Sequence, residues 1–261
     1  PLVVIGFIDI TDPANPVPAG TVALDGEPTA VSALGNHVLA AVNTSDSYTE
    51  PSGHVVVINP ATMEIAQTCE LGGQPDSTAV AHDGSFVAIA IENERDEDLN
   101  DGVIPQLPAG SVATFAAADG LLDCDSRVLA DLTGLADLAG EDPEPEFVDV
   151  NAAGHIVVTL QENNHLVVLE RDGTVVTHFP AGDVDLFHVD TEEEGALHFT
   201  NTLLDVPREP DAVQWLDANR FVIANEGDYQ GGSRGFTIMN HVDDVLYESG
   251  TAFEHEVIMH G

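Results

Sequence analysis

The sequence predicts an all-β protein, a β-propeller built from four-stranded blades. Its apolar residues fall into short runs rich in β-branched side chains that end at Gly, Pro, Asn or Asp, and one pattern of strands recurs four times along the 261 residues. With 43% hydrophobic residues and a mean hydropathy of +0.04, the chain can bury a core despite its acidity. We therefore expect a single folded domain over residues 1–261.

The predicted strands begin at the first residues, with apolar segments at 3–10 and 18–24. Four repeated units follow. Each unit opens on an acidic or amide residue plus proline, continues through two strands joined at a Gly or Asn turn, and closes on Asn or Glu. The apolar runs are nearly continuous, which is typical of strands buried on both faces. The clearest of these runs are residues 38–42, 54–58, 86–91, 156–160, 165–169 and 221–224.

The spacing of the units favours propeller blades. The prolines that open them, Pro28, Pro75, Pro145 and Pro210, lie 47, 70 and 65 residues apart. A third strand follows each unit after a loop, and a more polar fourth strand follows in most units. Blades usually repeat every ~40–50 residues, so we expect insertions, which are acidic and lie near 95–109 and 181–206. A β-sandwich has strands at similar spacing without this recurrence.

Two segments differ from the repeated pattern. Leucines at 129, 132, 135 and 138, with Gly140 behind them, predict a short connecting helix over residues 129–138. Residues 247–258 resemble one further strand. The strands make roughly four to five blades, so the chain is either a small propeller or part of a larger ring of about seven blades. We expect the second.

The charge excludes several partners. Acidic residues number 46 and basic residues 6, all of them Arg, for a formal net charge of −40. Nucleic acid and anionic membranes need Lys and Arg on the protein, so neither is an expected partner. No run of 18 apolar residues exists, so we expect no membrane insertion within this chain, and the first ten residues resemble a strand rather than a signal peptide. Self-repulsion on this scale predicts a halophilic protein, or one surrounded by divalent cations.

The two cysteines leave an alternative open. Cys69 and Cys124 are too few for a disulfide framework and lack CxxC spacing, which excludes a zinc ribbon or a thioredoxin-type site. They are either two buried thiols or, if the protein is exported, one disulfide.

Several motifs, in order, resemble the choice-of-anchor I family. They are Asp9-Ile-Thr-Asp-Pro-Ala-Asn-Pro16, Gln74-Pro75-Asp76 with Glu92-Asn93-Glu94, Glu144-Pro145-Glu146-Phe147-Val148 with Leu160-Gln161-Glu162-Asn163-Asn164, and Glu209-Pro210-Asp211-Ala212 with Ala224-Asn225-Glu226-Gly227-Asp228. That family is related to the "esterase-like activity of phytase" domains and to mesenchyme-specific cell-surface glycoproteins. The resemblance implies a secreted or cell-surface β-propeller, usually from a longer chain with an anchoring signal. The near absence of Lys and Arg is a departure from the family.

Equivalent residues of successive blades converge at one end of a propeller channel. The carboxylates that flank the repeated prolines, including Glu27 and Asp76, and those that close the second strands are therefore candidates for one acidic ring. Carboxylates together with the carbonyls of Asn43, Asn93 and Asn163, and of the equivalent Asn225, suit Ca²⁺. The same motifs can instead cap turns and join blades by hydrogen bonds to the backbone. The predicted metal ligands are Glu92, Glu94, Glu146, Glu162, Glu209, Asp211, Glu226 and Asp228.

Other motifs are weaker. Residues 96–102 resemble a calcium loop, but Gly102 comes one place late and Leu107 stands where a bidentate Glu belongs, so we expect a solvated insertion. His255 and His260 are five residues apart, which excludes the HExxH zinc motif. Neither a GxSxG elbow nor a phosphate-binding glycine loop is present, and no catalytic residue is predicted.

Two functions remain open. The first is a secreted or cell-surface binding or scaffold module that acts through protein or glycan partners, with calcium as a candidate stabilising ion. The second is a Ca²⁺-dependent phosphoesterase, a phytase-like or alkaline-phosphatase-like hydrolase. Only Arg208, Arg220 and Arg234 lie near the repeat ends, so a phosphate substrate would depend on bound cations. The lack of a complete nucleophile and base favours the binding module.

Overall fold

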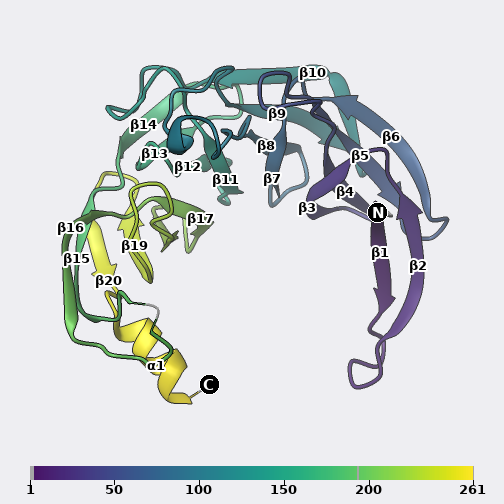
Figure 1. Ribbon diagram of the computed structural model, residues 1–261. Helices are drawn as coiled ribbons and strands as arrows, with labels where there is room; N and C mark the ends of the chain where they lie inside the picture. Colours follow the sequence, from purple (N-terminus) through teal and green to yellow (C-terminus); the bar gives the residue numbers. More distant parts are fainter. Residues whose placement is uncertain (1–2, 193, 261) are drawn as a thin grey trace.

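In the computed structural model, which describes residues 3–192 and 194–260, the chain forms six antiparallel sheets, and those with four strands follow one another along an open arc (Figure 1). Residues 1–2, 193 and 261 of the predicted domain lie outside the described residues. Four of the sheets have four strands each and are the predicted blades. The sheets do not close into a ring, so a ring of about seven blades stays a prediction.

Each blade is a meander whose strands follow chain order from the channel outward, with β3, β7, β11 and β17 innermost (Figure 1). The first blade comprises β3 (Glu27–Leu34), β4 (His37–Asn43), β5 (Gly53–Asn59) and β6 (Glu64–Glu70), and the second β7 (Pro75–Val80), β8 (Phe86–Ile91), β9 (Ser111–Ala118) and β10 (Leu121–Asp131). The third comprises β11 (Pro145–Val150), β12 (Ile156–Leu160), β13 (His165–Leu169) and β14 (Val175–Pro180), and the fourth β17 (Pro210–Trp215), β18 (Arg220–Asn225), β19 (Phe236–Asn240) and β20 (Val245–Glu248).

The other two sheets are two-stranded hairpins. One joins β1 (Val4–Asp9) to β2 (Val17–Ala23) and precedes the first blade. The other joins β15 (Asp183–Val189) to β16 (Asn201–Pro207) and lies between the third and fourth blades in the chain. The second hairpin is the predicted insertion near 181–206, and it has a small apolar core of its own around Leu186.

The cores lie between neighbouring blades. Leu39 and Ile89 pack between the first and second blades, Val158 between the second and third, and Phe221 between the third and fourth. Each such side chain contributes about 1.5–3 kcal/mol when fully buried. A central strand touches a core on both faces, which explains why the strands of residues 86–91 and 156–160 are continuously apolar.

Hydrogen bonds join the innermost strands across the blade interfaces. The Ser32 hydroxyl contacts Thr78, and the Ser77 hydroxyl accepts from the Val148 N–H at 2.9 Å. The Thr159 hydroxyl donates to the Asp211 carbonyl at 2.7 Å. These bonds hold the starts of β7, β11 and β17 in a fixed relation to one another.

The predicted helix over 129–138 is wrong. Residues up to Asp131 continue β10, and turns follow. The leucine spacing arises from two different environments, because Leu129 is exposed on the outermost strand while Leu132 is fully buried between blades. The Asp131 carboxylate accepts from the Thr133 N–H at 2.9 Å and stabilises a turn in place of a helix.

The predicted strand over 247–258 is also wrong. β20 ends at Glu248, and a helix, α1 (Ala252–His260), follows the turn at Gly250. The only α-helix among the described residues, α1 is too short to cross a membrane.

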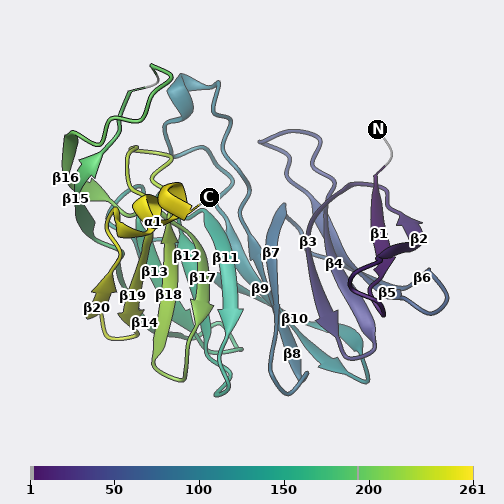
Figure 2. The same ribbon diagram turned by 90° about the horizontal axis from the view of Figure 1, so that it is seen from below.

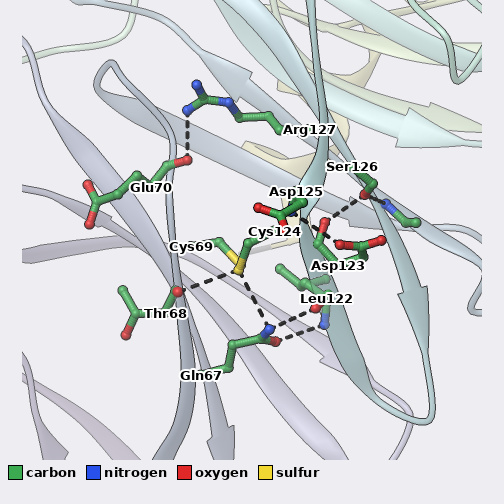
Figure 3. Close-up of a disulfide and its surroundings, with 11 residues drawn as sticks. Gln67, Thr68, Cys69, Glu70, Leu122, Asp123, Cys124, Asp125, Ser126 and Arg127 are labelled. Carbon is green, nitrogen blue, oxygen red and sulfur yellow. Dashed lines mark hydrogen bonds between the residues drawn. A yellow bond between two sulfur atoms is a disulfide. The ribbon is translucent and has the colours of Figure 1, made fainter.

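Cys69 and Cys124 form a disulfide, which settles the alternative left open by the sequence (Figure 3). It links β6 to β10, the outermost strands of the first two blades, with the Cα atoms 5.4 Å apart. Gln67 bridges the same strands, since its amide donates to the Leu122 carbonyl at 2.7 Å and accepts from the Leu122 N–H at 2.9 Å. Arg127 adds a bond to the Glu70 carbonyl.

Candidate metal centre

The innermost strands β7, β11 and β17 start at the same end of the channel (Figure 2), and the carboxylates of the repeats lie at or near these starts. The strand register explains this placement. Pro75 pairs with Ile91, and Pro145 pairs with Leu160. Residues at the starts of the innermost strands therefore lie beside residues that follow the ends of the second strands.

Three carboxylates from two blades form the centre of this group. Asp76 lies on β7, Glu92 directly follows β8, and Glu146 lies on β11. One oxygen of each lies within 4.8 Å of the other two. We call these three residues the carboxylate triad.

The triad carboxyls are poor acids in the folded protein. Burial is the largest cause, and it raises the pKa of Asp76 to about 6 and that of Glu146 to about 12. Burial followed by the negative charge of Asp76 raises the pKa of Glu92 well above its usual value. The triad must therefore hold protons or a cation at neutral pH.

A second group, around Arg95, lies next to the triad. The Arg95 guanidinium contacts Glu162, lies 3.1 Å from Asp228 and 3.7 Å from Glu144, and stacks on the Tyr229 ring at 5.4 Å. Glu144 is fully buried, yet neither of its carboxylate oxygens has a hydrogen-bond partner, and one oxygen of Glu162 also lacks one. Sequence reasoning missed Arg95 and Glu144, although Arg95 directly follows the repeat end Glu92-Asn93-Glu94. The three arginines named near the repeat ends make none of these contacts.

The other predicted ligands lie around the triad and have partners of their own. Glu94 is exposed and accepts from the Gln74 amide at 3.0 Å. Glu209 is buried and accepts from the Gln230 N–H at 2.6 Å, which holds the loop after β18. Asp211 and Glu226 lie close together at the fourth blade, Asp228 pairs with Arg95, and Glu27 is exposed at the first blade.

The repeated asparagines have the structural role that the sequence also allowed. The Asn93 side chain accepts from the Gln74 N–H at 2.9 Å and donates to the Ala109 carbonyl. Asn163 accepts from the Glu144 N–H at 3.0 Å and donates to the Asp142 carbonyl. Asn43 caps a turn through the Ser45 N–H, and Asn225 bonds Thr237. Asn93 and Asn163 thus fix the chain where one blade leads into the next, and Asn43 and Asn225 stabilise their own blades.

Residues 97–101 of the insertion are exposed, as the sequence predicts, but buried residues flank them. Arg95 and Ile104 are buried, and the Ile104 N–H donates to the Tyr229 hydroxyl at 3.3 Å. The Gln106 N–H donates to Asp142 at 2.5 Å. The insertion thus contacts the third and fourth blades at the end of the channel where the triad lies.

The triad is complete at one blade interface. Gln161 directly follows β12 as Glu92 follows β8, so at the next interface the position equivalent to Glu92 has an amide in place of the carboxylate. The Gln161 amide donates to Glu226 at 2.5 Å. No other group of three metal-ligating side chains meets the same distance criterion within residues 3–192 and 194–260.

The fold resembles that of solved β-propellers. The β-propeller domain of Cps50 (Swd1) from Myceliophteria thermophila aligns with a TM-score of 0.52 at 14% identity, over 84% of this chain and 59% of that one. Kuenenia stuttgartiensis hydrazine synthase aligns with a TM-score of 0.58 at 14% identity, over 93% of this chain and 66% of that one. This chain spans about three fifths to two thirds of these two structures, and at such identity the likeness concerns the fold alone.

A sequence comparison with curated proteins finds no match. The choice-of-anchor I domain, in contrast, matches residues 2–231, which is most of the chain. The repeats, the four-stranded blades and this match agree: the protein belongs to the choice-of-anchor I family and has a β-propeller fold.

Proposed function

We propose that this chain is a binding module of a cell-surface propeller, organised around a calcium ion held by Asp76, Glu92 and Glu146. The observation that carries the proposal is the carboxylate triad, whose oxygens from two blades lie within 4.8 Å of one another. The family match supports a surface role, because a choice-of-anchor domain is expected on a protein anchored outside the cell. The disulfide between Cys69 and Cys124 agrees with an oxidising compartment.

Electrostatics disfavours a triad of three ionised carboxylates without a cation. Two carboxylates about 4 Å apart repel each other by about 4 kcal/mol at the effective dielectric constant of a protein surface. The triad contains three pairs, each with oxygens within 4.8 Å, and Glu92 is 6% exposed, so water screens the charges poorly. Only protons or a cation can relieve this repulsion.

The donor set fits calcium. Ca²⁺ takes about six to eight oxygen ligands, and carboxylates bind it through one or both oxygens. Three carboxylates supply three to six oxygens, so they leave coordination positions free unless every one of them binds through both oxygens. Asp76 and Glu146 are half-buried on channel-facing strands, so the remaining positions would be open to water or to oxygens of a protein or glycan partner.

The phosphoesterase alternative has less support. A phosphate substrate needs positive charge beside the metal. The nearest guanidinium, that of Arg95, already pairs with Glu162, Glu144 and Asp228. The site is therefore better suited to a cation and a neutral or oxygen-rich partner than to a phosphate ester.

Calcium titration of chelator-treated protein, followed by calorimetry, tests the proposal. We expect one ion per chain in the wild type and none at the same concentrations in Glu92→Gln, which reproduces the Gln161 arrangement. Glu226→Gln, which alters the exposed carboxylate after β18, is the matched control and should bind normally. A wild type that binds no calcium would refute the proposal, and so would Glu92→Gln that binds as well as the wild type. Hydrolysis of p-nitrophenyl phosphate that needs both calcium and Glu92 would favour the phosphoesterase instead.

A further inference from the structure

We infer that the Arg95 guanidinium occupies a second cation position, formed by Glu144 and Glu162, and acts there as the counter-ion of these carboxylates. The carboxylates at this end of the channel can then bind only one metal ion, at the triad. The inference rests on the proposed function, because the metal ion it limits is the one assigned to the triad. It adds a role for a residue that lies outside the triad and outside the strands.

The first observation is that Arg95 contacts carboxylates of blades other than its own. It lies in the insertion that follows the second blade, but its guanidinium contacts Glu162 and lies 3.7 Å from Glu144, both in the third blade. It also lies 3.1 Å from Asp228 after β18. One side chain thus spans three blades and ends among carboxylates.

The second observation is the burial of that pocket. Glu144 is fully buried, Glu162 is 2% exposed and Arg95 is 6% exposed. Two carboxylates at this depth need a positive charge beside them. A guanidinium stays protonated at every physiological pH, so Arg95 supplies that charge without an ion from solution.

The third observation is that the guanidinium fits the pocket incompletely. Both oxygens of Glu144, the second oxygen of Glu162 and the Nε of Arg95 have no hydrogen-bond partner although they are buried. A well-matched Arg–carboxylate pair forms two parallel hydrogen bonds, which Glu144 lacks. Buried carboxylate oxygens without a hydrogen-bond partner are what a hard divalent cation would bind.

The Tyr229 side chain holds Arg95 in this position. The guanidinium stacks on its ring, and its hydroxyl accepts from the Ile104 N–H at the other end of the same insertion. These two contacts therefore hold the insertion so that the guanidinium stays beside Glu144 and Glu162. Only the triad is left for an ion from solution.

Removing the guanidinium tests the inference. Calcium stoichiometry is measured by equilibrium dialysis of the full chain for the wild type, Arg95→Met and the double variant Arg95→Met/Glu144→Gln. Methionine keeps a long unbranched side chain without the charge. We expect one ion in the wild type, two in Arg95→Met and one in the double variant.

The outcomes separate this inference from the proposed function. A wild type that binds no ion would refute the triad site. The counter-ion role would still be supported if Arg95→Met then bound one ion and the double variant bound none. One ion in both the wild type and folded Arg95→Met would refute the counter-ion and leave the triad site standing, as would two ions in the wild type.

Folding provides a second measurement. If Arg95→Met unfolds in chelator, millimolar calcium should restore the wild-type circular dichroism spectrum, because the ion then replaces the guanidinium. An Arg95→Met chain that stays unfolded at millimolar calcium would overturn the inference.

Discussion

Glu92 and Gln161 occupy equivalent positions after the second strands of adjacent blades. Glu92 has a carboxylate where Gln161 has an amide. This difference decides which interface carries three carboxylates. The amide of Gln161 also donates to Glu226, a bond that a carboxylate at this position cannot make. Replacing Gln161 with a carboxylate therefore tests whether cation binding can be gained at the second interface.

Gln161→Glu should create a second cation centre together with Glu146 and Asp211. Without calcium, the new charge beside Glu226 should lower the free energy of unfolding by about 1–3 kcal/mol. Calcium should restore it. Thermal unfolding of both proteins, in chelator and in calcium, measures the effect. An equal melting temperature for variant and wild type in chelator, or a loss that calcium does not reverse, would contradict the assignment.

The triad also predicts a pH dependence for the calcium-free protein. Burial raises the folded-state pKa of Asp76 from 3.8 to about 6 and that of Glu146 to about 12, so the folded chain binds more protons than the unfolded chain between these values. Stability should therefore fall as pH rises from about 4 to 8, by about 1–3 kcal/mol for Asp76 alone.

Denaturant unfolding in chelator at several pH values checks this dependence. With saturating calcium the trend should disappear, because the ion favours the ionised carboxylates. A calcium-free protein whose stability rises steadily with pH would show that the triad carboxylates are ionised and otherwise stabilised.

Among the elements, the outermost strands of the first two blades are joined by Cys69–Cys124, which closes a sequence separation of 55 residues. Replacing both cysteines with alanine should cost about 2–4 kcal/mol of stability, because the unfolded chain gains freedom. Guanidinium denaturation measures the loss. Calcium affinity should not change, since the triad lies on inner strands. An unchanged denaturation midpoint, or a loss of calcium binding, would contradict this assignment.

The strands were predictable because their signals are local. Each blade repeats the same proline, turn and apolar runs, and buried central strands such as β8 and β12 leave continuous apolar segments. The helix over 129–138 failed because Leu129 and Leu132 meet different neighbours, which their spacing does not reveal. The predicted strand over residues 247–258 failed because a turn at Gly250 ends β20 and leads into α1.

The site was predictable in part. Repetition indicates that carboxylates meet at the channel end, and two of the eight predicted ligands, Glu92 and Glu146, do so together with Asp76. Repetition does not reveal which carboxylates are engaged elsewhere, as Glu209 is by the loop after β18. Arg95 escaped detection because its partners lie in other blades, at sequence separations that no motif spans.

For the whole molecule, the net charge of −40 is carried by a folded arc of sheets with apolar strands. The cation centre accounts for only a few of the 46 acidic residues. The remainder should repel one another and destabilise the compact state unless salt screens them.

Sodium chloride should therefore stabilise the chelator-treated protein. We expect the melting temperature to rise by about 4–8 °C between dilute buffer and molar salt, which corresponds to about 2 kcal/mol. Glu92→Gln should show the same rise, since the effect belongs to the surface charge. Equal melting temperatures at both salt concentrations would contradict the halophilic interpretation.

The central claim is that the triad binds a metal ion between the second and third blades. Anomalous X-ray scattering from crystals soaked in calcium or terbium tests it most directly. We expect one strong peak surrounded by carboxylate oxygens of Asp76, Glu92 and Glu146, at about 2.3–2.6 Å for calcium. An empty triad in such crystals, or a peak at surface carboxylates only, would contradict it.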